Sequence, residues 1–395
     1  MEPLLPASRL SELAELSCEI LRCSNRLLEY IPSHTARRGI AHLVRGMNSY
    51  YSNLIEGHKT LPRDIESALQ SDFSDKPTER DNQHLAAAHI QVEELMRERL
   101  LHEPEWSIHS PEFICWVHRE FYQRLPDHLQ FTETHRGRQQ RLQPGVLRDH
   151  EVTVGAHQPP ASSALPEFMR RFEQFYSSKT LPATSQLMAL AAGHHRLAWI
   201  HPFGDGNGRV ARLHSHAWLI RCQADAGGLW TISRGLARQR QGYYLHLRTA
   251  DQQRQGDFDG RGNLSDRGLA EFCVFFLRSM LDQIEFMSEL LQLPALVSRI
   301  EAHLHLHHGD WSLKKREQAA RVLREGLIVD EIERGRVSQL AGISDTTARG
   351  LIHRLMDEGF MTSTTPKGPL RLRFSTKVLE TWFPKLYQDL PLGTY

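Results

Sequence analysis

One short stretch of the chain gathers the side chains that phosphate chemistry requires. It begins at His201, places Asp205 four residues later, and continues through Asn207 to Arg209 and Arg212. Histidine accepts a proton near neutral pH, as a hydroxyl nucleophile requires. A single carboxylate with phosphate oxygens and waters commonly holds Mg²⁺, and arginines bind polyphosphate oxygens. These residue types therefore predict a site that binds a nucleoside triphosphate and activates a hydroxyl for attack on one of its phosphates.

Two helices are expected to position these groups. Residues 185–200 carry apolar side chains at helical spacing, and Pro202 disfavours helical geometry in the residue before it, so His201 should lie at or just past the helix end. Gly206-Asn207-Gly208 can adopt the backbone angles of an anion-binding nest. The next helix should begin near Arg209, so that its N-terminal dipole adds to the nest.

Each of these residues also has a plainer interpretation. An isolated histidine is more often a capping or core residue, and an isolated aspartate more often forms an Asx-turn. Two arginines one turn apart more often belong to a solvated basic face. The combination of all of them between residues 201 and 212 favours the phosphate site.

The same stretch resembles the signature of the Fic (Fido) family of protein AMP-transferases at every defined position. The resemblance implies that His201 deprotonates a Ser, Thr or Tyr hydroxyl of a target protein, that the oxygen attacks the α-phosphate of ATP, and that pyrophosphate leaves. It further implies that Asp205 holds Mg²⁺ or Mn²⁺, that the amides around Asn207 stabilise the α-phosphate, and that Arg212 engages the γ-phosphate. Gly208 stands where the Doc toxins carry lysine, which favours nucleotidyl over phosphoryl transfer.

Two further segments extend the resemblance. Residues 151–160, which include Val154 and Gly155, resemble the family's flap, a hairpin that clamps the target segment by strand addition. Tyr243 and Tyr244 resemble part of the downstream helix that closes the nucleotide pocket, although paired aromatics on a helix are more often core residues.

An inhibitory element is predicted near the N-terminus. Ser52 and Glu56 lie one helical turn apart, share a face, and precede Gly57 as in the family's inhibitory pattern. A glutamate presented there could pair with Arg212 and deny it to the γ-phosphate. Two alternatives remain: an exposed glutamate at a helix end, and a glutamate that orients a water for removal of AMP.

The expected fold is mainly α: a Fic-type helical bundle with a short β-hairpin flap over residues 151–157, plus a small C-terminal winged-helix domain. Apolar periodicity predicts helices over residues 8–31, 36–56, 79–100, 110–125, 164–178, 183–200, 209–223, 233–250 and 266–290. The domains expected are an N-terminal helical region carrying the inhibitory helix (about 40–57), a catalytic core, a linker helix and a winged helix-turn-helix-like domain, over residues 1–110, 111–292, 293–310 and 311–395.

The C-terminal module has two interpretations. Residues 337–349 read as helix, glycine turn and helix, and residues 359–374 then alternate around a Pro/Gly turn, which resembles a winged helix-turn-helix. Residues 311–377 hold thirteen Lys or Arg against eight Asp or Glu, a balance of about +5 that suits phosphate contacts. DNA binding through residues 337–374 and protein docking are both kept. The histidine-rich tract His303–His308 is expected to be a solvated linker helix and not a metal site.

Composition bounds the remaining expectations. Hydrophobic residues make up 40% and charged residues 24%, and no run of about 18 apolar residues would span a membrane. Five scattered cysteines and the lack of a secretion signal favour reduced thiols in the cytoplasm. We expect an enzyme whose target docks on the flap, with self-AMPylation as a further outcome, and a homodimer. The alternative function is a nucleotide-sensing transcriptional regulator that uses the winged helix on DNA.

Overall fold

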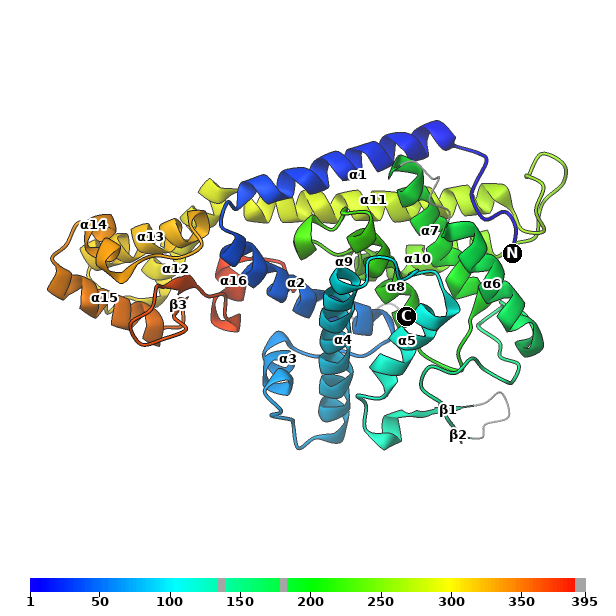
Figure 1. The fold of residues 1–395 in the computed structure, drawn as a ribbon, viewed down its shortest axis with the longest axis horizontal. Helices are drawn as coiled ribbons and strands as arrows, with labels where there is room; N and C mark the ends of the chain where they lie inside the picture. Colours follow the sequence, from blue (N-terminus) through cyan, green and yellow to red (C-terminus); the bar gives the residue numbers. More distant parts are fainter. Residues whose placement is uncertain (134–138, 178–182, 388–395) are drawn as a thin grey trace. The chain divides into compact units, whose positions relative to one another are not determined.

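The computed structural model describes residues 1–133, 139–177 and 183–387 and is mainly helical, as predicted (Figure 1). The helices before the catalytic stretch are α1 (Leu10–Tyr30), α2 (His34–Ile55), α3 (Pro62–Leu69), α4 (Pro77–His102), α5 (Pro111–Tyr122), α6 (Leu165–Tyr176) and α7 (Ala183–Ile200). Those after it are α8 (Asn207–Arg221), α9 (Ser233–Arg238), α10 (Arg240–Ala250), α11 (Asp266–Leu291), α12 (Leu293–His307), α13 (Leu313–Ile328), α14 (Val337–Ala341), α15 (Asp345–Asp357) and α16 (Leu379–Trp382).

Strands are few and short. One antiparallel sheet pairs β1 (Phe131–Glu133) with β2 (Gln139–Arg141), and the other pairs β3 (Met361–Thr362) with β4 (Arg371–Leu372). The predicted hairpin at residues 151–157 is instead a tight turn that a single bridge between Val154 and His157 closes. Gly155 takes a φ of +59° in that turn, which favours glycine. The turn thus leaves most of the flap backbone outside any strand.

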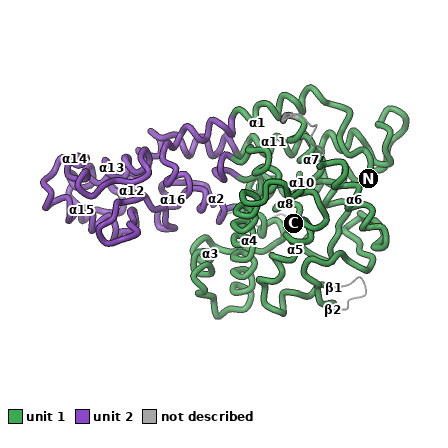
Figure 2. The backbone as a smooth tube through the Cα atoms, viewed as in Figure 1, with its two compact units in different colours: residues 1–22, 48–225, 231–283 green, residues 23–47, 226–230, 284–395 purple. Residues whose placement is uncertain are grey.

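The chain divides into two compact units (Figure 2). Unit 1 comprises residues 1–22, 48–225 and 231–283, and unit 2 comprises residues 23–47, 226–230 and 284–395. The division differs from the domain boundaries expected from the sequence, because residues 1–22 and 48–110 of the expected N-terminal region share unit 1 with most of the expected core, whereas residues 23–47 belong to unit 2. Within unit 2, Asp330 accepts from the Ser33 hydroxyl (3.1 Å) and the Thr35 amide (2.8 Å), which ties the N-terminal segment of the unit to its C-terminal part.

Unit 1 is built around helix α8. This helix contacts α7, α4 and α5, and its residues from Arg209 to Leu219 are buried around the whole circumference. Helix α8 therefore has no solvent-exposed face, and the spacing of its polar and apolar residues does not indicate which side packs against the core. Helix α7 packs against α6 as well, so the loop between α7 and α8 begins and ends on buried helices.

The predicted helix over residues 233–250 is two helices, α9 and α10. Gln239 separates them with φ −115° and ψ +36°, outside helical geometry. Helix α3 was not predicted, because only eight residues form it and its buried side chains are Ile65 and Ala68. Both differences concern short elements whose periodicity is weak.

Unit 2 contains the predicted helix-turn-helix elements. Helix α14 ends at Gly342 (φ +66°), and the Ser344 side chain caps α15 by accepting from the Thr347 amide. Strands β3 and β4 follow, and an isolated bridge joins Ile332 to Leu370. This element order is the one expected of a winged helix, and the domain assignment stays a prediction.

The tract His303–His308, expected to be a solvated linker helix, is solvated only in part, because His303, Leu304 and His308 are buried. Leu296, Ile300 and Leu304 are buried against neighbouring elements, and α12 contacts α13 and α16. The His303 side chain is buried and bonds to the Thr381 hydroxyl at 2.7 Å. One face of α12 therefore belongs to the core of unit 2.

Within the described residues, every helix is too short or too polar to cross a lipid bilayer.

The close packing of α7 on α8 generates a stability prediction. A Cβ atom added at Gly193 would lie 2.7 Å from the ring of Trp218, which is fully buried and cannot yield. Gly193→Ala should therefore lower the free energy of unfolding by about 1–3 kcal/mol in denaturant titrations. The matched control is Gly242→Ala in α10, where the nearest atom lies 3.5 Å away. That variant should gain up to about 1 kcal/mol from helix propensity, and equal effects at both glycines would contradict the packing argument.

Candidate active site

The loop between α7 and α8 is held by the side chain of Asn207. Its Oδ1 atom accepts from the Phe203 amide (3.0 Å), and its Nδ2 atom donates to the Phe203 carbonyl (2.8 Å). Asn207 is the first residue of α8, so these two bonds fix the loop to the N-terminus of that helix. Gly206 precedes it at φ +79°, and a Cβ there would lie 2.7 Å from the Tyr122 ring. Glycine is therefore required at this position by conformation and by space.

Arg148 holds the other side of the loop. Its side chain is buried, and its Nε atom donates to the His201 carbonyl at 2.9 Å while its own amide donates to the Pro202 carbonyl at 2.9 Å. The remaining guanidinium nitrogens donate to the carbonyls of His150 (2.9 Å) and Pro160 (2.5 Å). One arginine thus connects the flap segment to the residue predicted as the catalytic base.

His201 has an uncommon backbone conformation and a perturbed ring. Its φ is +51°, in the left-handed region that non-glycine residues rarely adopt. Burial lowers the pKa of His201 to about 4, and the charges of Arg148 and His157 add to that shift. The imidazole is therefore neutral at pH 7 and able to accept a proton.

Asp205 is exposed, and two residues of α5 position it. The Tyr122 hydroxyl donates to its Oδ2 atom at 2.9 Å. The Gly145 amide donates to Nδ1 of His118 at 2.8 Å, so Nε2 of that ring carries the proton and donates to the Asp205 carbonyl at 3.3 Å. The His118 ring also stacks on Phe203, with ring centroids 3.9 Å apart. Burial and the carboxylate of Asp205 raise the pKa of Tyr122, which keeps the hydroxyl protonated as a donor.

The sequence analysis missed Tyr122, His118 and the bonding role of Arg148. His118 and Tyr122 lie one helical turn apart on α5, a spacing that places two polar aromatics on one buried face. That spacing was the only available signal.

The two arginines of α8 meet the predicted inhibitory segment. Nε of Arg212 donates to the Ser52 hydroxyl at 2.9 Å, and its Nη2 atom donates to the Ser52 carbonyl at 3.0 Å and to Glu56 Oε1 at 2.6 Å. Nε of Arg209 donates to Asn53 Oδ1 at 3.1 Å. Every one of these partners lies in the last turn of α2 or just after it.

The Glu56 carboxylate is ionised in this position. Burial would raise its pKa, but the charges of Arg212 and Arg209 and the bond from Arg212 outweigh that effect and lower the pKa overall. A Cβ at Gly208 would lie 2.5 Å from Glu56 Oε1, so the carboxylate rests directly on the first turn of α8. An anion is thus held where amides at a helix N-terminus favour one.

The predicted residues of α10 and the flap differ in burial. Tyr243 is buried, with its hydroxyl 2.8 Å from His194 Nε2, whereas Tyr244 is 38% exposed and donates to the Ile55 carbonyl at 3.3 Å. Val154 is exposed on the flap turn, and His157 anchors that turn through a bond from Nε2 to the Trp199 carbonyl (2.8 Å). Only Tyr244 of the tyrosine pair is accessible.

Among the described residues, no three His, Cys, Asp or Glu side chains form a group that could hold a metal ion by themselves. A metal at this site would therefore take most of its ligands from phosphates and water, with Asp205 as the protein carboxylate.

Comparison with known proteins identifies the domain. Residues 108–219 match the family model described as Fic/DOC family. A protein adenylyltransferase Fic of Drosophila mojavensis is 34% identical over 103 residues, which cover 26% of this chain and 20% of that protein. The Drosophila erecta protein of the same name is 38% identical over 80 residues, or 20% and 16% of the two chains. The match therefore spans no more than a fifth of these curated relatives.

Solved structures share the fold. A Fic family protein from Desulfovibrio desulfuricans superposes with a TM-score of 0.54 at 17% identity over 94% of this chain and 98% of the other. A Fic domain containing signaling protein from Bacteroides thetaiotaomicron superposes with a TM-score of 0.51 at 16% identity over 69% and 97%. Residues 108–219, which include the α7–α8 loop, are therefore similar in sequence to the Fic/DOC family, and the chain shares its fold with these solved structures.

Proposed function

We propose that the protein is an adenylyltransferase that moves AMP from ATP to a Ser, Thr or Tyr hydroxyl of a target protein. The observation that carries the proposal is a neutral imidazole at His201 beside the N-terminus of α8, where Arg212 already binds a carboxylate. The relatives called protein adenylyltransferase Fic support the same activity.

The proposed step uses residues of unit 1 alone. His201 accepts the proton of the target hydroxyl, whose oxygen attacks the α-phosphorus of ATP. The bond from the α-phosphorus to the bridging oxygen breaks, and pyrophosphate leaves with that electron pair. The backbone amides at Asn207 and Gly208 face the developing charge on the α-phosphate, and Arg209 and Arg212 bind the outer phosphates.

Asp205 fits the Mg²⁺ or Mn²⁺ ion that the family implies. Its carboxylate is exposed, supplies hard oxygen ligands, and is oriented through Oδ2 by the Tyr122 hydroxyl. When bound, such an ion would neutralise charge on the nucleotide phosphates.

We propose further that Glu56 inhibits the enzyme. Its carboxylate takes the Arg212 nitrogen that would bind the γ-phosphate, at 2.6 Å, and lies against Gly208. ATP bound beside it would be displaced from the alignment needed for attack. The alternative role, in which Glu56 orients a water for removal of AMP, stays a prediction, as do docking of the target on residues 151–160, self-AMPylation and the homodimer.

Release of this contact is the first functional test. Glu56→Gly should raise transfer of labelled AMP to protein by about 10²-fold, because an ångström-scale misalignment costs about that factor. The measurement is incorporation of label from α-labelled ATP, into the protein itself and into lysate proteins. Glu98→Gly, at an exposed position of α4, is the matched control and should leave transfer unchanged.

His201→Ala in the Glu56→Gly background should abolish the label. Label that persists would remove His201 as the base, and equal transfer by Glu56→Gly and the parent would remove the inhibitory role.

The pKa of His201 predicts the pH profile. With the pKa lowered to about 4, the ring stays unprotonated from pH 8 down to about pH 5. Single-turnover transfer by Glu56→Gly should therefore be flat across that range and fall as the pH approaches about 4. Because of the same shift, His201 binds fewer protons in the folded state than in the unfolded state between about pH 4 and pH 6.5. The contribution of His201 to the free energy of unfolding therefore falls as the pH is lowered from about 6.5 to about 4.

A nuclear magnetic resonance titration of the ring, assigned by its loss in His201→Ala, gives the pKa directly. A midpoint near 6.5 in that titration and in the rate profile would contradict the burial argument.

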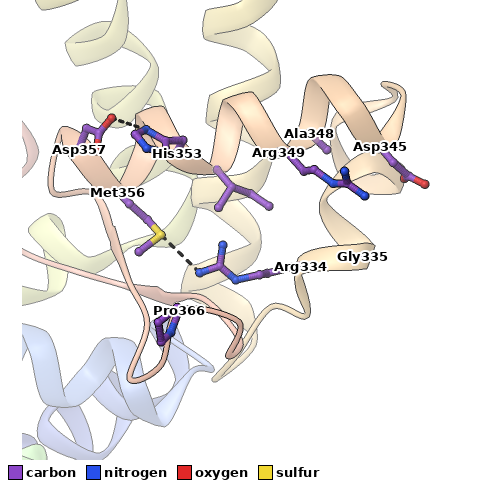
Figure 3. A pocket seen from close by; sticks show the side chains of 10 residues that line it. Arg334, Gly335, Asp345, Ala348, Arg349, His353, Met356, Asp357 and Pro366 are labelled. Carbon is purple, nitrogen blue, oxygen red and sulfur yellow. Dashed lines mark hydrogen bonds and ion pairs between the residues drawn. The ribbon is translucent and has the colours of Figure 1, made fainter.

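Unit 2 supports a second candidate function, binding of duplex DNA through α15. A groove of about 560 Å³ lies between this helix and the turn before β4, lined by Arg334, Arg349 and the turn residue Pro366 among others (Figure 3). Arg334 donates to the Gly368 carbonyl at 2.9 Å and so fixes the turn beside the helix. Arg349 is exposed on the same face of α15, and exposed cations on a helix-turn-helix contact phosphates.

Salt dependence tests this function. A gel shift on random duplex should weaken with salt, and Arg349→Ala should reduce the log–log slope by about 1. Arg354→Ala on the same helix is the control, because Asp310 already pairs with that guanidinium at 2.7 Å. Absence of binding by the intact protein at low salt would favour the protein-docking role.

A further inference from the structure

Helix α2 bonds to both arginines of α8 through the same atom, Nε. Nε of Arg212 donates to the Ser52 hydroxyl at 2.9 Å, and Nε of Arg209 donates to Oδ1 of the next residue, Asn53, at 3.1 Å. A bond at Nε fixes the plane of a guanidinium and leaves its two terminal nitrogens, Nη1 and Nη2, for other acceptors. Two adjacent side chains of α2 therefore orient the two cations at the start of α8.

The guanidinium of Arg209 is the less occupied of the two. Nη2 of Arg212 donates to the Ser52 carbonyl and to Glu56. Among the described residues, Nη1 and Nη2 of Arg209 have no hydrogen-bond partner, and the guanidinium lies over the Phe121 ring, 5.5 Å from its centroid. The terminal nitrogens of Arg209 are therefore available to an anion while Glu56 is in place.

In the described part of the chain, the Asn53 side chain makes this one hydrogen bond. Nε of Arg209 is a donor, so only the amide oxygen of Asn53 can face it. The amide nitrogen Nδ2 is buried without a partner in the same part of the chain, and Asn53 as a whole is 1% exposed. A buried donor without an acceptor is costly, and helix propensity also favours alanine over asparagine. The bond to Arg209 is therefore the interaction that explains an asparagine at this position.

The Asn53 backbone contributes separately, to the position of Glu56. Its carbonyl accepts from the Glu56 amide at 3.0 Å and from the His58 amide at 2.9 Å, which sets the turn after α2. These bonds do not involve the side chain, so Asn53→Ala should leave them intact. Removal of the side chain can therefore change Arg209 without releasing Glu56.

We propose that Asn53 is a positioning residue that orients Arg209 toward an outer phosphate of ATP, so that α2 contributes to substrate binding as well as to inhibition. The inference rests on the proposed function, in which Arg209 binds such a phosphate. AMP has no outer phosphate, so Asn53 affects the affinity for ATP and not the affinity for AMP. The active enzyme is then one in which α2 stays docked and only the Glu56 carboxylate withdraws.

The first measurement compares nucleotides in the Glu56→Gly background. Asn53→Ala should raise the dissociation constant for ATP about tenfold in calorimetry, as expected for loss of a hydrogen bond to a charged group, and should leave that for AMP unchanged. In the transfer assay, KM for ATP should rise by the same factor while kcat stays unchanged, because His201 and its loop are not altered.

Ser49→Ala is the matched control for general loosening of α2. Ser49 lies one turn before Asn53, is fully buried, and donates from its hydroxyl to the Ala86 carbonyl of α4 at 2.9 Å. Its removal weakens the attachment of α2 at a bond that involves neither arginine, so both dissociation constants should stay unchanged. An ATP-specific loss as large as that of Asn53→Ala would assign the effect to loosening of the helix and overturn the proposal.

Two further results separate positioning from inhibition and from structural damage. With Glu56 in place, Asn53→Ala should leave AMP transfer at or below that of the parent, and activation comparable to Glu56→Gly would overturn the proposal. In the Arg209→Ala background, Asn53→Ala should cause no further loss of ATP affinity, because the partner of its Oδ1 atom is already absent. An equal loss for ATP and AMP, or an additive loss on top of Arg209→Ala, would also overturn it.

Binding is measured apart from transfer, so failure of this inference and failure of the proposed function give different results. An ATP-specific loss of affinity in a protein that transfers no AMP would reject the adenylyltransferase and keep the positioning role. Transfer that depends on His201, without an ATP-specific loss in Asn53→Ala, would keep the adenylyltransferase and reject the positioning role.

Discussion

The buried charge of Arg212 constrains the packing of unit 1 around it. A guanidinium removed from water is costly unless acceptors and a negative charge surround it. In this structure Ser52 and Glu56 supply both, at 2.6–3.0 Å. A nucleotide phosphate, like the carboxylate, offers negative charge and oxygen acceptors. Under the proposed function, the nucleotide and Glu56 would therefore meet the same electrostatic requirement of Arg212 in turn.

The scaffold serves that requirement by making the first turn of α8 rigid. Asn207 bonds twice to the backbone of Phe203, and Arg148 bonds to the His201 carbonyl from the opposite side. Because α8 is buried on all sides, the turn has little freedom to follow a ligand. The amides and the two arginines are therefore preorganised, which is the condition under which dipoles stabilise a developing charge most effectively.

The sequence predicted well those helices and motifs whose residues lie close together along the chain. Helices α1, α2, α4 to α8 and α11 appear within a few residues of their expected bounds because apolar side chains recur at helical spacing. The residues from His201 to Arg212 and the pair Ser52–Glu56 were found because each set is contiguous or one turn apart. The structure brings these two sets together through the bonds of Arg212 across a separation of 156 to 160 residues.

What the sequence could not predict comes from contacts between distant segments. Tyr122 meets Asp205 across 83 residues and Arg148 meets His201 across 53, and neither pair leaves a periodic trace. The Tyr243 hydroxyl meets His194 across 49 residues, and no spacing in the sequence indicates that contact. Pattern matching gave Tyr243 and Tyr244 one role, whereas packing separates them by burial.

Gly208 makes room for the Glu56 carboxylate beside Arg212. With no side chain, it leaves the volume in which the Glu56 carboxylate rests, since a Cβ would lie 2.5 Å from Oε1. Any larger residue at this position would compete with that carboxylate for the same space. A side chain at position 208 would therefore displace the Glu56 carboxylate from the start of α8 and from Arg212 at the same time.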